Sequence, residues 1–466
     1  MNMNTIFVIL AKGQEVRNFL YGDLSRLAKD RPDVRLIVFL PKEKADKYRN
    51  QFEHERCVLI AMPAINLDWR LKKLFRIACF GCIPTSTIWS RIWFSYLNGG
   101  SVFNLAGKLF FWMLGHFRAW RAIMRWAEYN LFRDDRAWGE YFERYTPNVV
   151  FGGGLLNEED FLAIKYAKRR GIPTAGITCS WDNFTSKGFL RVHPDILFLQ
   201  NESMVKEAIV LNSFPRERIR VVGFPQWDHY FDPSWHMTKE EFGKKFGIDP
   251  AKRWITYFGG GLLKGLFGLP ENGDHVVMLN RAIEQGEIRN ACTIIRAHPG
   301  HIADLSEEAK KSPLLNFGKG WEFNADDMRL LLNLVRLSDV TLNFGSTMAL
   351  EAALFDKPIV LMTFTGFAGD SSAPWHKRPD TAFRYTLHYK EVIATGGLWR
   401  VENERELVHA VKSYLDNPLL HHEGRKKIVS EFVGPHDGNA GKRIFDILLS
   451  LAEKKGQKTP VDASQL

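Results

Sequence analysis

The residues best suited to bind an anionic substrate lie in the second half of the chain, directly after segments that read as buried strands. Arg296-Ala297-His298-Pro299-Gly300 follows a strand predicted over Thr293–Ala297. A proline after the histidine fixes the loop, so the imidazole of His298 can donate a hydrogen bond to a phosphate oxygen, and Arg296 can add positive charge. The alternative is a strand-end turn with a surface histidine.

A second strand end carries small and hydroxylated residues before a helix. The strand Val340–Asn343 leads into Phe344-Gly345-Ser346-Thr347, and a helix is predicted over Thr347–Phe355. Gly345 permits a tight turn, while the hydroxyls of Ser346 and Thr347 and the first helical amides form an anion site. Glu351 can then accept hydrogen bonds from ribose hydroxyls. The alternative is a serine N-cap with a solvated glutamate.

Glycine runs follow one strand in each half. Gly259-Gly260-Gly261 comes after Trp254–Phe258, and Gly152-Gly153-Gly154 comes after Asn148–Phe151. Such runs allow a ligand to approach the backbone closely, and they also occur in flexible turns. Neither run continues into a Walker sequence or a dinucleotide fingerprint.

The first half supplies the candidate catalytic acids. Ser180-Trp181-Asp182-Asn183-Phe184-Thr185-Ser186-Lys187-Gly188 follows the strand Thr174–Thr178. Asp182 can act as the general base for an acceptor hydroxyl, or it can simply cap its loop. Glu15, after the first strand, is the reserve base. The Cys79-x-x-Cys82 pair is isolated and apolar in context, which favours core cysteines, and no metal-binding set is evident.

The alternation of apolar runs and amphipathic stretches indicates an α/β protein with parallel sheets. Further strands are predicted at Thr5–Leu10, Val34–Phe39, Val58–Ala61, Ile196–Leu199, Ile219–Val222 and Ile359–Met362, and further helices at Glu158–Arg169, Glu202–Leu211, Asp326–Leu337 and Glu404–Leu415. We expect two doubly wound Rossmann-like domains facing a cleft. They comprise residues 1–235, with a helical insertion at about 69–140, and residues 236–452, followed by a disordered tail at 453–466.

Composition limits the function classes. The 466 residues carry a net charge of +10, which indicates contact with phosphates, nucleic acid or an anionic membrane face. Five cysteines in this length favour a reducing compartment without a disulfide framework. Residues 6–11 are too short for a signal-peptide core, and no apolar run reaches the length of a membrane span, so we expect a cytoplasmic protein.

Residues 69–138 are unusual because they combine aromatic and basic side chains. Seven of the fourteen tryptophans lie there, with many arginines and lysines and only three acids, Glu128, Asp134 and Asp135. Rings and cations on amphipathic helices are typical of a membrane interface. The alternatives are an insertion that packs its aromatics on the core, or a surface that binds single-stranded nucleic acid.

These motifs resemble bacterial surface-polysaccharide transferases with the glycosyltransferase-B fold. That group includes CDP-glycerol glycerophosphotransferases, His-Pro-motif sialyltransferases and capsule Kdo transferases, and UDP-N-acetylglucosamine 2-epimerases share its architecture. The resemblance lies in Arg296–Pro299, Asp339–Glu351 and Lys357-Pro358. The strings Ser180–Gly188, Arg191–Asp195 and Gly223–Asp228 are similar to "surface carbohydrate biosynthesis" proteins of the same fold.

The resemblance implies that His298 contacts the donor phosphate or nucleotide, that Ser346 and Thr347 bind phosphate, and that Glu351 holds ribose. We therefore expect a metal-independent enzyme that moves a sugar or polyol phosphate from a nucleotide-activated donor to a lipid-linked or polymeric glycan acceptor. It would need no cofactor, would not bind nucleic acid, and would be peripheral on the inner face of the plasma membrane. The alternatives are a nucleotide-sugar 2-epimerase and a non-catalytic nucleotide-sugar-binding protein of an assembly complex.

Overall fold

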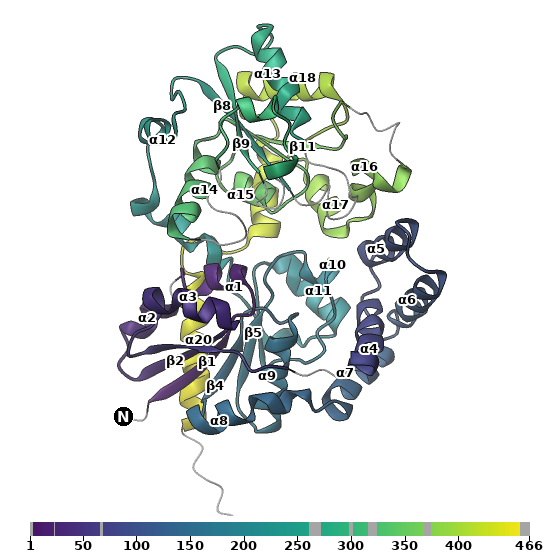
Figure 1. Cartoon of the computed structure of the whole chain (residues 1–466), viewed down its shortest axis with the longest axis vertical. Helices are drawn as coiled ribbons and strands as arrows, with labels where there is room; N and C mark the ends of the chain where they lie inside the picture. Colours follow the sequence, from purple (N-terminus) through teal and green to yellow (C-terminus); the bar gives the residue numbers. More distant parts are fainter. Residues whose placement is uncertain are drawn as a thin grey trace, which may run out of the picture. The chain divides into compact units, whose positions relative to one another are not determined.

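The computed structural model describes residues 3–22, 24–65, 69–260, 272–297, 302–315, 324–367 and 374–456. The chain divides into two compact units. The first comprises residues 1–92, 101–231 and 434–466, and the second comprises residues 93–100 and 232–433 (Figure 1). No helix within the described ranges has both the length and the apolar character needed to cross a bilayer.

The first unit is built on a parallel sheet with the strand order β3-β2-β1-β4-β5-β6-β7. Its strands are β1 (Asn4–Ile9), β2 (Val34–Leu40), β3 (Cys57–Ala61), β4 (Val149–Gly152), β5 (Thr174–Ile177), β6 (Ile196–Leu199) and β7 (Ile219–Val221). The order reverses between β1 and β4. In open parallel sheets, ligands bind outside the carboxyl ends of the strands at such a reversal.

Helices of the first unit cover both faces of this sheet or form the insertion. They are α1 (Gly13–Phe19), α2 (Leu24–Lys29), α3 (Lys42–Phe52), α4 (Trp69–Gly81), α5 (Ser86–Leu97), α6 (Val102–Leu114), α7 (Arg118–Leu131), α8 (Gly139–Tyr145), α9 (Glu158–Arg169), α10 (Asn183–Ser186), α11 (Glu202–Asn212) and α20 (Ala440–Gly456). The end of α5 clusters with the second unit, where Phe94 is buried in the core.

The second unit has a parallel sheet with the strand order β12-β11-β10-β8-β9. Its strands are β8 (Arg253–Phe258), β9 (Ala291–Arg296), β10 (Val340–Asn343), β11 (Ile359–Met362) and β12 (Trp399–Val401). Its helices are α12 (Lys239–Phe246), α13 (Asp274–Glu284), α14 (Ala325–Leu337), α15 (Met348–Leu354), α16 (Pro379–Tyr385), α17 (Leu387–Ala394), α18 (Glu404–Asp416) and α19 (His422–Ile428). Here the order reverses between β10 and β8.

The fold confirms the predicted α/β class and all of the predicted strands, whereas β12 was not predicted. The domain limits differ at the carboxyl end. Residues 236–452 were assigned to one domain, but residues from 434 onward belong to the first unit. The reason is that Ile444, Phe445 and Leu448 on α20 are buried in the hydrophobic core of the first sheet. This helix runs on to Gly456, beyond the expected start of a disordered tail, and residues 457–466 lie outside the described ranges.

Candidate functional site

The second unit brings three of the predicted strand ends to one edge of its sheet. Phe258 on β8 pairs with Asn343 on β10 and with Arg296 on β9, and the Gly259 amide donates to the Arg296 carbonyl at 2.8 Å. The residues after these strands therefore share the carboxyl edge, and the reversal between β8 and β10 lies among them. Gly259 and Gly260 thus follow the strand that neighbours the one preceding Gly345, Ser346 and Thr347.

The turn after β10 is held by side chains. Asn343 Oδ1 accepts hydrogen bonds from the Gly345 amide at 3.0 Å and from the Tyr389 hydroxyl at 3.1 Å. Gly345 has a φ of +78°, and a Cβ at this position would clash with the ring of Phe383. Only glycine fits this turn, because both the backbone conformation and the space exclude a side chain.

Ser346 and Thr347 lie at the start of α15, as predicted. The Ser346 hydroxyl accepts a hydrogen bond from the Met348 amide at 3.3 Å, and Thr347 is the N-cap residue. Glu351 is buried in the first turns of this helix, which differs from the alternative of a solvated glutamate. Gly260 is itself buried, and a Cβ added there would meet no atom of the described residues within 4 Å.

The Arg296 side chain forms hydrogen bonds within the second unit. Its guanidinium donates to Asp327 Oδ1 at 2.7 Å and to the Leu315 carbonyl at 3.0 Å. The Asp327 carboxylate neutralises its charge, so the phosphate contact proposed for Arg296 stays a prediction. His298 lies outside the described residues, and its predicted role also stays a prediction.

The first unit places Asp182 at the start of α10 with a partly exposed side chain. Its Oδ2 accepts a hydrogen bond from the Ser186 hydroxyl at 2.7 Å, and the Lys187 ammonium lies 3.7 Å from Oδ1. The side chain of Asp182 is 20% exposed and that of Lys187 is 52% exposed. A carboxylate with this exposure can meet an acceptor hydroxyl.

Glu15, the reserve base, is fully buried at the reversal of the first sheet. Its Oε1 accepts a hydrogen bond from Asn157 Nδ2 at 2.6 Å, and its Oε2 accepts one from the Lys12 amide at 3.1 Å. Burial raises the pKa of Glu15, although the hydrogen bonds to Cys179, Lys12 and Asn157 act against this rise.

Glu15 has a buried partner that the sequence motifs did not indicate. Asp160, on α9, is also fully buried, and its Oδ1 accepts a hydrogen bond from the Gly154 amide at 2.8 Å. Burial, and then the nearby Glu15 carboxyl, raise the pKa of Asp160 well above its usual value. Gly154 also lies tightly against Glu15, because a Cβ there would clash with that carboxyl. The signal that could have found this cluster is the acid in the first turn of the helix that follows the glycine run.

Two further predicted features have structural roles. Cys79 and Cys82 are buried and free, as expected for core cysteines. Asp228 caps α20, since its carboxylate accepts hydrogen bonds from the Ala440 and Gly441 amides at 2.9 and 2.7 Å.

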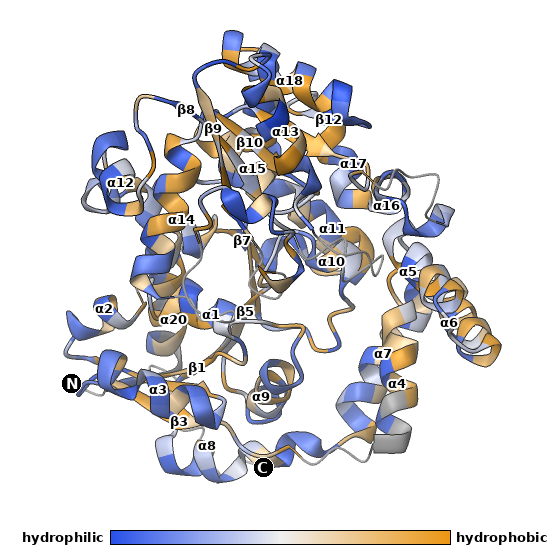
Figure 2. Cartoon of the chain, turned by 45° about the horizontal axis from the view of Figure 1, so that its top comes forward, coloured by the Kyte–Doolittle hydropathy of each residue, from blue (hydrophilic) through white to orange (hydrophobic). Residues whose placement is uncertain are grey.

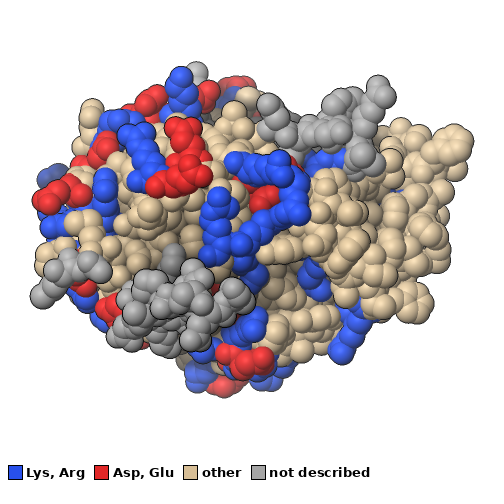
Figure 3. Space-filling model, turned by 90° about the horizontal axis from the view of Figure 1, so that it is seen from below, with Lys and Arg blue, Asp and Glu red and all other residues tan. Residues whose placement is uncertain are grey.

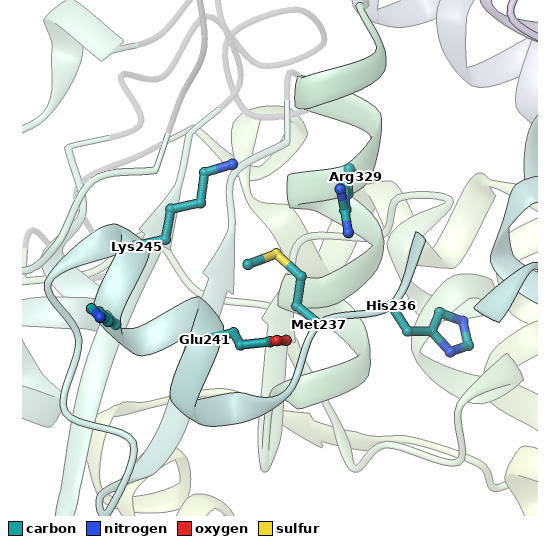
Figure 4. A pocket seen from close by; sticks show the side chains of 6 residues that line it. His236, Met237, Glu241, Lys245 and Arg329 are labelled. Atoms are coloured by element: carbon teal, nitrogen blue, oxygen red, sulfur yellow. The ribbon is translucent and has the colours of Figure 1, made fainter. Parts of the chain in front are cut away.

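A separate hollow of about 570 Å³ lies between α12 and α14 (Figure 4). Its lining residues are His236, Met237, Glu241, Lys244, Lys245 and Arg329. None of these residues belongs to the strand-end sites above. Among the described residues, no group of three or more His, Cys, Asp or Glu side chains is placed to hold a metal ion.

Solved structures of the same architecture are numerous. UDP-GlcNAc 2-epimerase from Neisseria meningitidis, bound to UDP-GlcNAc, matches with a TM-score of 0.55 at 12% identity, over 96% of this chain and 100% of that chain. The S. aureus MnaA–UDP complex matches with a TM-score of 0.53 at 13% identity, over 96% and 98%. The wall teichoic acid polymerase TagF matches with a TM-score of 0.54 at 11% identity, over 97% and 90%.

These matches, with the two parallel sheets, show that the chain has the two-domain glycosyltransferase-B fold. No protein-family model matches the sequence. No curated protein matches it either. At identities of 11–13%, the likeness establishes the fold and leaves the reaction to be argued from the site.

Proposed function

We propose that this protein is a nucleotide-sugar-dependent glycosyltransferase, or a polyol-phosphate transferase, that acts on a hydroxyl of a surface-glycan acceptor. The observation that carries the proposal is the second unit's strand reversal, where Gly259 and Gly260 follow β8 and Gly345, Ser346 and Thr347 follow its paired strand β10. Solved proteins of this fold include ones whose structures hold UDP-GlcNAc or UDP.

The donor phosphates would lie at this reversal. The glycine backbone at Gly259 and Gly260 would let a diphosphate approach closely, and the hydroxyls of Ser346 and Thr347 can donate hydrogen bonds to its oxygens. These donors stabilise negative charge that grows on the leaving phosphate as its bond to the transferred group breaks. His298 would add a further donor, and Glu351 would bind ribose.

The acceptor would bind to the first unit, with Asp182 as the base. The acceptor oxygen forms a bond to the transferred carbon or phosphorus, the bond to the leaving phosphate breaks, and the acceptor proton passes to Asp182. We prefer Asp182 to Glu15 because Asp182 is partly exposed, whereas Glu15 is enclosed and holds its carboxyl in a hydrogen-bonded network.

A nucleotide-sugar 2-epimerase is the second candidate. It is favoured by the likeness to solved UDP-GlcNAc 2-epimerases across nearly the whole chain. An epimerase acts on one small substrate and has no use for an apolar surface. The insertion at α4–α7 exposes many large apolar side chains, which supports a transferase that works at a membrane surface.

Thermal-shift measurements with CMP, CDP, UDP and GDP test the donor site, because a ligand that binds the folded state raises its melting temperature. Ser346→Ala and His298→Ala should weaken the response, and Ser430→Ala, at an exposed helical serine, is the matched control. Labelled nucleotide sugars added to membranes then separate transfer from epimerisation. Binding without turnover would support the non-catalytic alternative, and unchanged donor turnover in both site variants would refute the site.

A further inference from the structure

The insertion in the first unit has an outer surface made of large apolar side chains. We call it the outer apolar face and define it by Phe103, Phe110, Met113, Phe117, Ile123 and Trp126, all of which are exposed. Phe103 is 91% exposed, and α6 contains no buried residue at all. Figure 2 shows α6 as an almost entirely hydrophobic helix. A surface of this kind is costly in water unless a partner covers it.

These residues form one face because of their spacing. Phe103, Phe110 and Met113 are separated by steps of seven and three positions, which return to the same side of α6. Phe117 is the N-cap residue of α7, and Ile123 and Trp126 lie three positions apart on that helix. The helix is held firmly beneath this face. Gly81 on α4 and Gly115 after α6 approach so closely that a Cβ on Gly115 would clash with the Gly81 carbonyl.

The charges around the outer apolar face have one sign. Glu128 is the only acid between residues 69 and 133, and it is fully buried. Its carboxylate pairs with Lys165 at 3.0 Å and with Lys72 at 3.1 Å. Arg76, Arg118 and Arg133 remain exposed, so the surface offers cations without acids. In Figure 3, the side of the molecule that carries α4 and α6 is mostly uncharged, with scattered basic residues and few acidic ones.

The structure corrects the simple count of basic residues made from the sequence. Lys72 and Arg121 are buried, and the Arg125 guanidinium donates to the Leu190 carbonyl at 3.0 Å. These cations hold the insertion together and do not meet a partner. The exposed arginines are therefore fewer than the sequence indicates.

The inner side of the same insertion holds the loop that carries Asp182. The Trp112 indole on α6 donates to the Thr85 carbonyl at 3.3 Å, and the Thr85 hydroxyl donates to the Thr185 carbonyl at 2.8 Å. The Arg91 guanidinium donates to the Ser186 carbonyl. A short chain of hydrogen bonds thus runs from the helix that bears the outer apolar face to the loop of the candidate base.

We propose that the outer apolar face inserts into the interface of an anionic lipid bilayer, and that the insertion thereby presents the Asp182 loop to a membrane-borne acceptor. Apolar rings enter the headgroup boundary, and the surrounding arginines meet lipid phosphates. A second copy of the chain fits less well, because a symmetric contact would place these cations against each other with no acid to pair them. The acceptor part of this proposal rests on the proposed transferase function.

Flotation with vesicles tests the lipid part independently of any activity. The full chain is mixed with vesicles of phosphatidylcholine alone or of phosphatidylcholine with phosphatidylglycerol. We expect strong flotation on the anionic vesicles, weakened by salt, and weak flotation on the neutral ones. The triple variant Phe103→Ser, Phe110→Ser, Met113→Ser should lower the partition coefficient by more than about tenfold. Val210→Ser with Leu419→Ser, at exposed apolar positions outside the insertion, is the matched control and should float like the wild type.

Two results would overturn the proposal. One is wild-type protein that stays out of the lipid fraction, and the other is a triple variant that floats as well as the wild type. A wild-type dimer that becomes a monomer in the triple variant, without flotation, would assign the face to a second copy. Nucleotide thermal shifts on the same samples keep the proposals distinguishable. Flotation without any nucleotide response would leave the lipid surface standing and remove the transferase function.

Discussion

Glu15 and Asp160 share one hydrogen-bond donor at the strand reversal of the first sheet. Asn157 Nδ2 lies 2.6 Å from Glu15 Oε1 and 3.2 Å from Asp160 Oδ2, and both carboxyl groups are fully buried. Two buried carboxylates this close repel each other, and burial disfavours their charged forms, so the pKa of each is raised. The pair therefore keeps a proton at a pH where exposed acids have lost theirs.

The first prediction concerns the pH dependence of stability. Because the folded-state pKa values of this pair are raised, its contribution to stability is fully present below the unfolded values of about 4 and is lost as pH rises through the folded values. Asp160→Asn removes one of the two charges. Its unfolding free energy should therefore improve relative to wild type between pH 5 and pH 8, by up to about 1.4 kcal/mol per pH unit for one proton.

Urea unfolding at both pH values checks this expectation. Asp195→Asn serves as a control of opposite sign. Burial alone would raise the pKa of Asp195, but hydrogen bonds from Lys168 and Thr174 outweigh it and lower the pKa. The ionised Asp195 carboxylate therefore stabilises the folded protein above the unfolded pKa, and this contribution is lost as pH falls through the folded pKa. Parallel stability profiles for Asp160→Asn and wild type would refute the shared proton.

The sequence predicted the strands well because each is a short run of apolar or β-branched residues bounded by turns, and such local patterns survive in the fold. Helix α9 begins and ends where it was expected, at Glu158 and Arg169. Contacts between distant residues were not predictable. Asn157 is the N-cap residue of α9, but its side chain makes no capping hydrogen bond and bridges Glu15 and Asp160.

The same limit applies to the candidate site. The order of strands at the reversal brings Gly260 and Ser346 to one edge of the sheet. Both residues could be selected from the sequence, because each lies just after a predicted strand. The partner of Arg296 could not be read from the sequence, because Asp327 lies on α14, which is distant in sequence from the strand that ends at Arg296. Similarly, composition identified the basic insertion, but only packing decides that Lys72 is buried while Arg118 is exposed.

The second prediction separates the two candidate bases. Asp182→Asn should lower kcat for transfer by about 10²–10⁴-fold with little change in donor affinity, because the acceptor proton loses its receiver. Glu15→Gln keeps one oxygen, which can accept from Asn157, while its amide nitrogen replaces the oxygen that accepts from the Lys12 amide. Because this residue is not the proposed base, kcat should change by less than about tenfold. Steady-state kinetics and nucleotide titration on both variants provide the measurement. The reverse order of effects would make Glu15 the base.

The third prediction concerns the backbone at the donor site. A Cβ at Gly260 meets no atom of the described residues within 4 Å, so the melting temperature of Gly260→Ala should stay near that of wild type. If a diphosphate lies against this backbone, the methyl group blocks it, and the nucleotide Kd should rise by at least about tenfold. Gly247→Ala, also with open space but at a φ of +69° after α12, is the control. It should lose about 1 kcal/mol of stability and keep nucleotide affinity. Equal affinity for Gly260→Ala and wild type would move the phosphates elsewhere.

The fourth prediction tests the link between the insertion and the Asp182 loop. Thr85→Val removes the hydroxyl that donates to the Thr185 carbonyl, and the loss of this buried hydrogen bond costs about 0.5–1.5 kcal/mol. We expect slower transfer to a membrane-borne acceptor with unchanged nucleotide binding. Ser90→Ala is the control, because its buried hydroxyl bonds the Thr87 carbonyl within α5 and does not reach the loop. Equal transfer rates in the two variants would show that the loop does not depend on this contact.

The last prediction concerns the ion-pair cluster that anchors the insertion to the first sheet. Lys165, on α9, is fully buried and lies 3.0 Å from Glu128 on α7 and 3.3 Å from Asp134. Lys165→Met leaves these carboxylates without one of their cations, which should destabilise the protein by about 3–5 kcal/mol. Lys168→Met removes a cation from the same helix whose pair with Asp195 is partly exposed, and it should cost no more than about 1 kcal/mol. Denaturant unfolding of the two variants measures the difference. Similar losses would mean that Lys72 and Arg191 compensate Glu128 without Lys165, and that the insertion is held mainly by apolar packing.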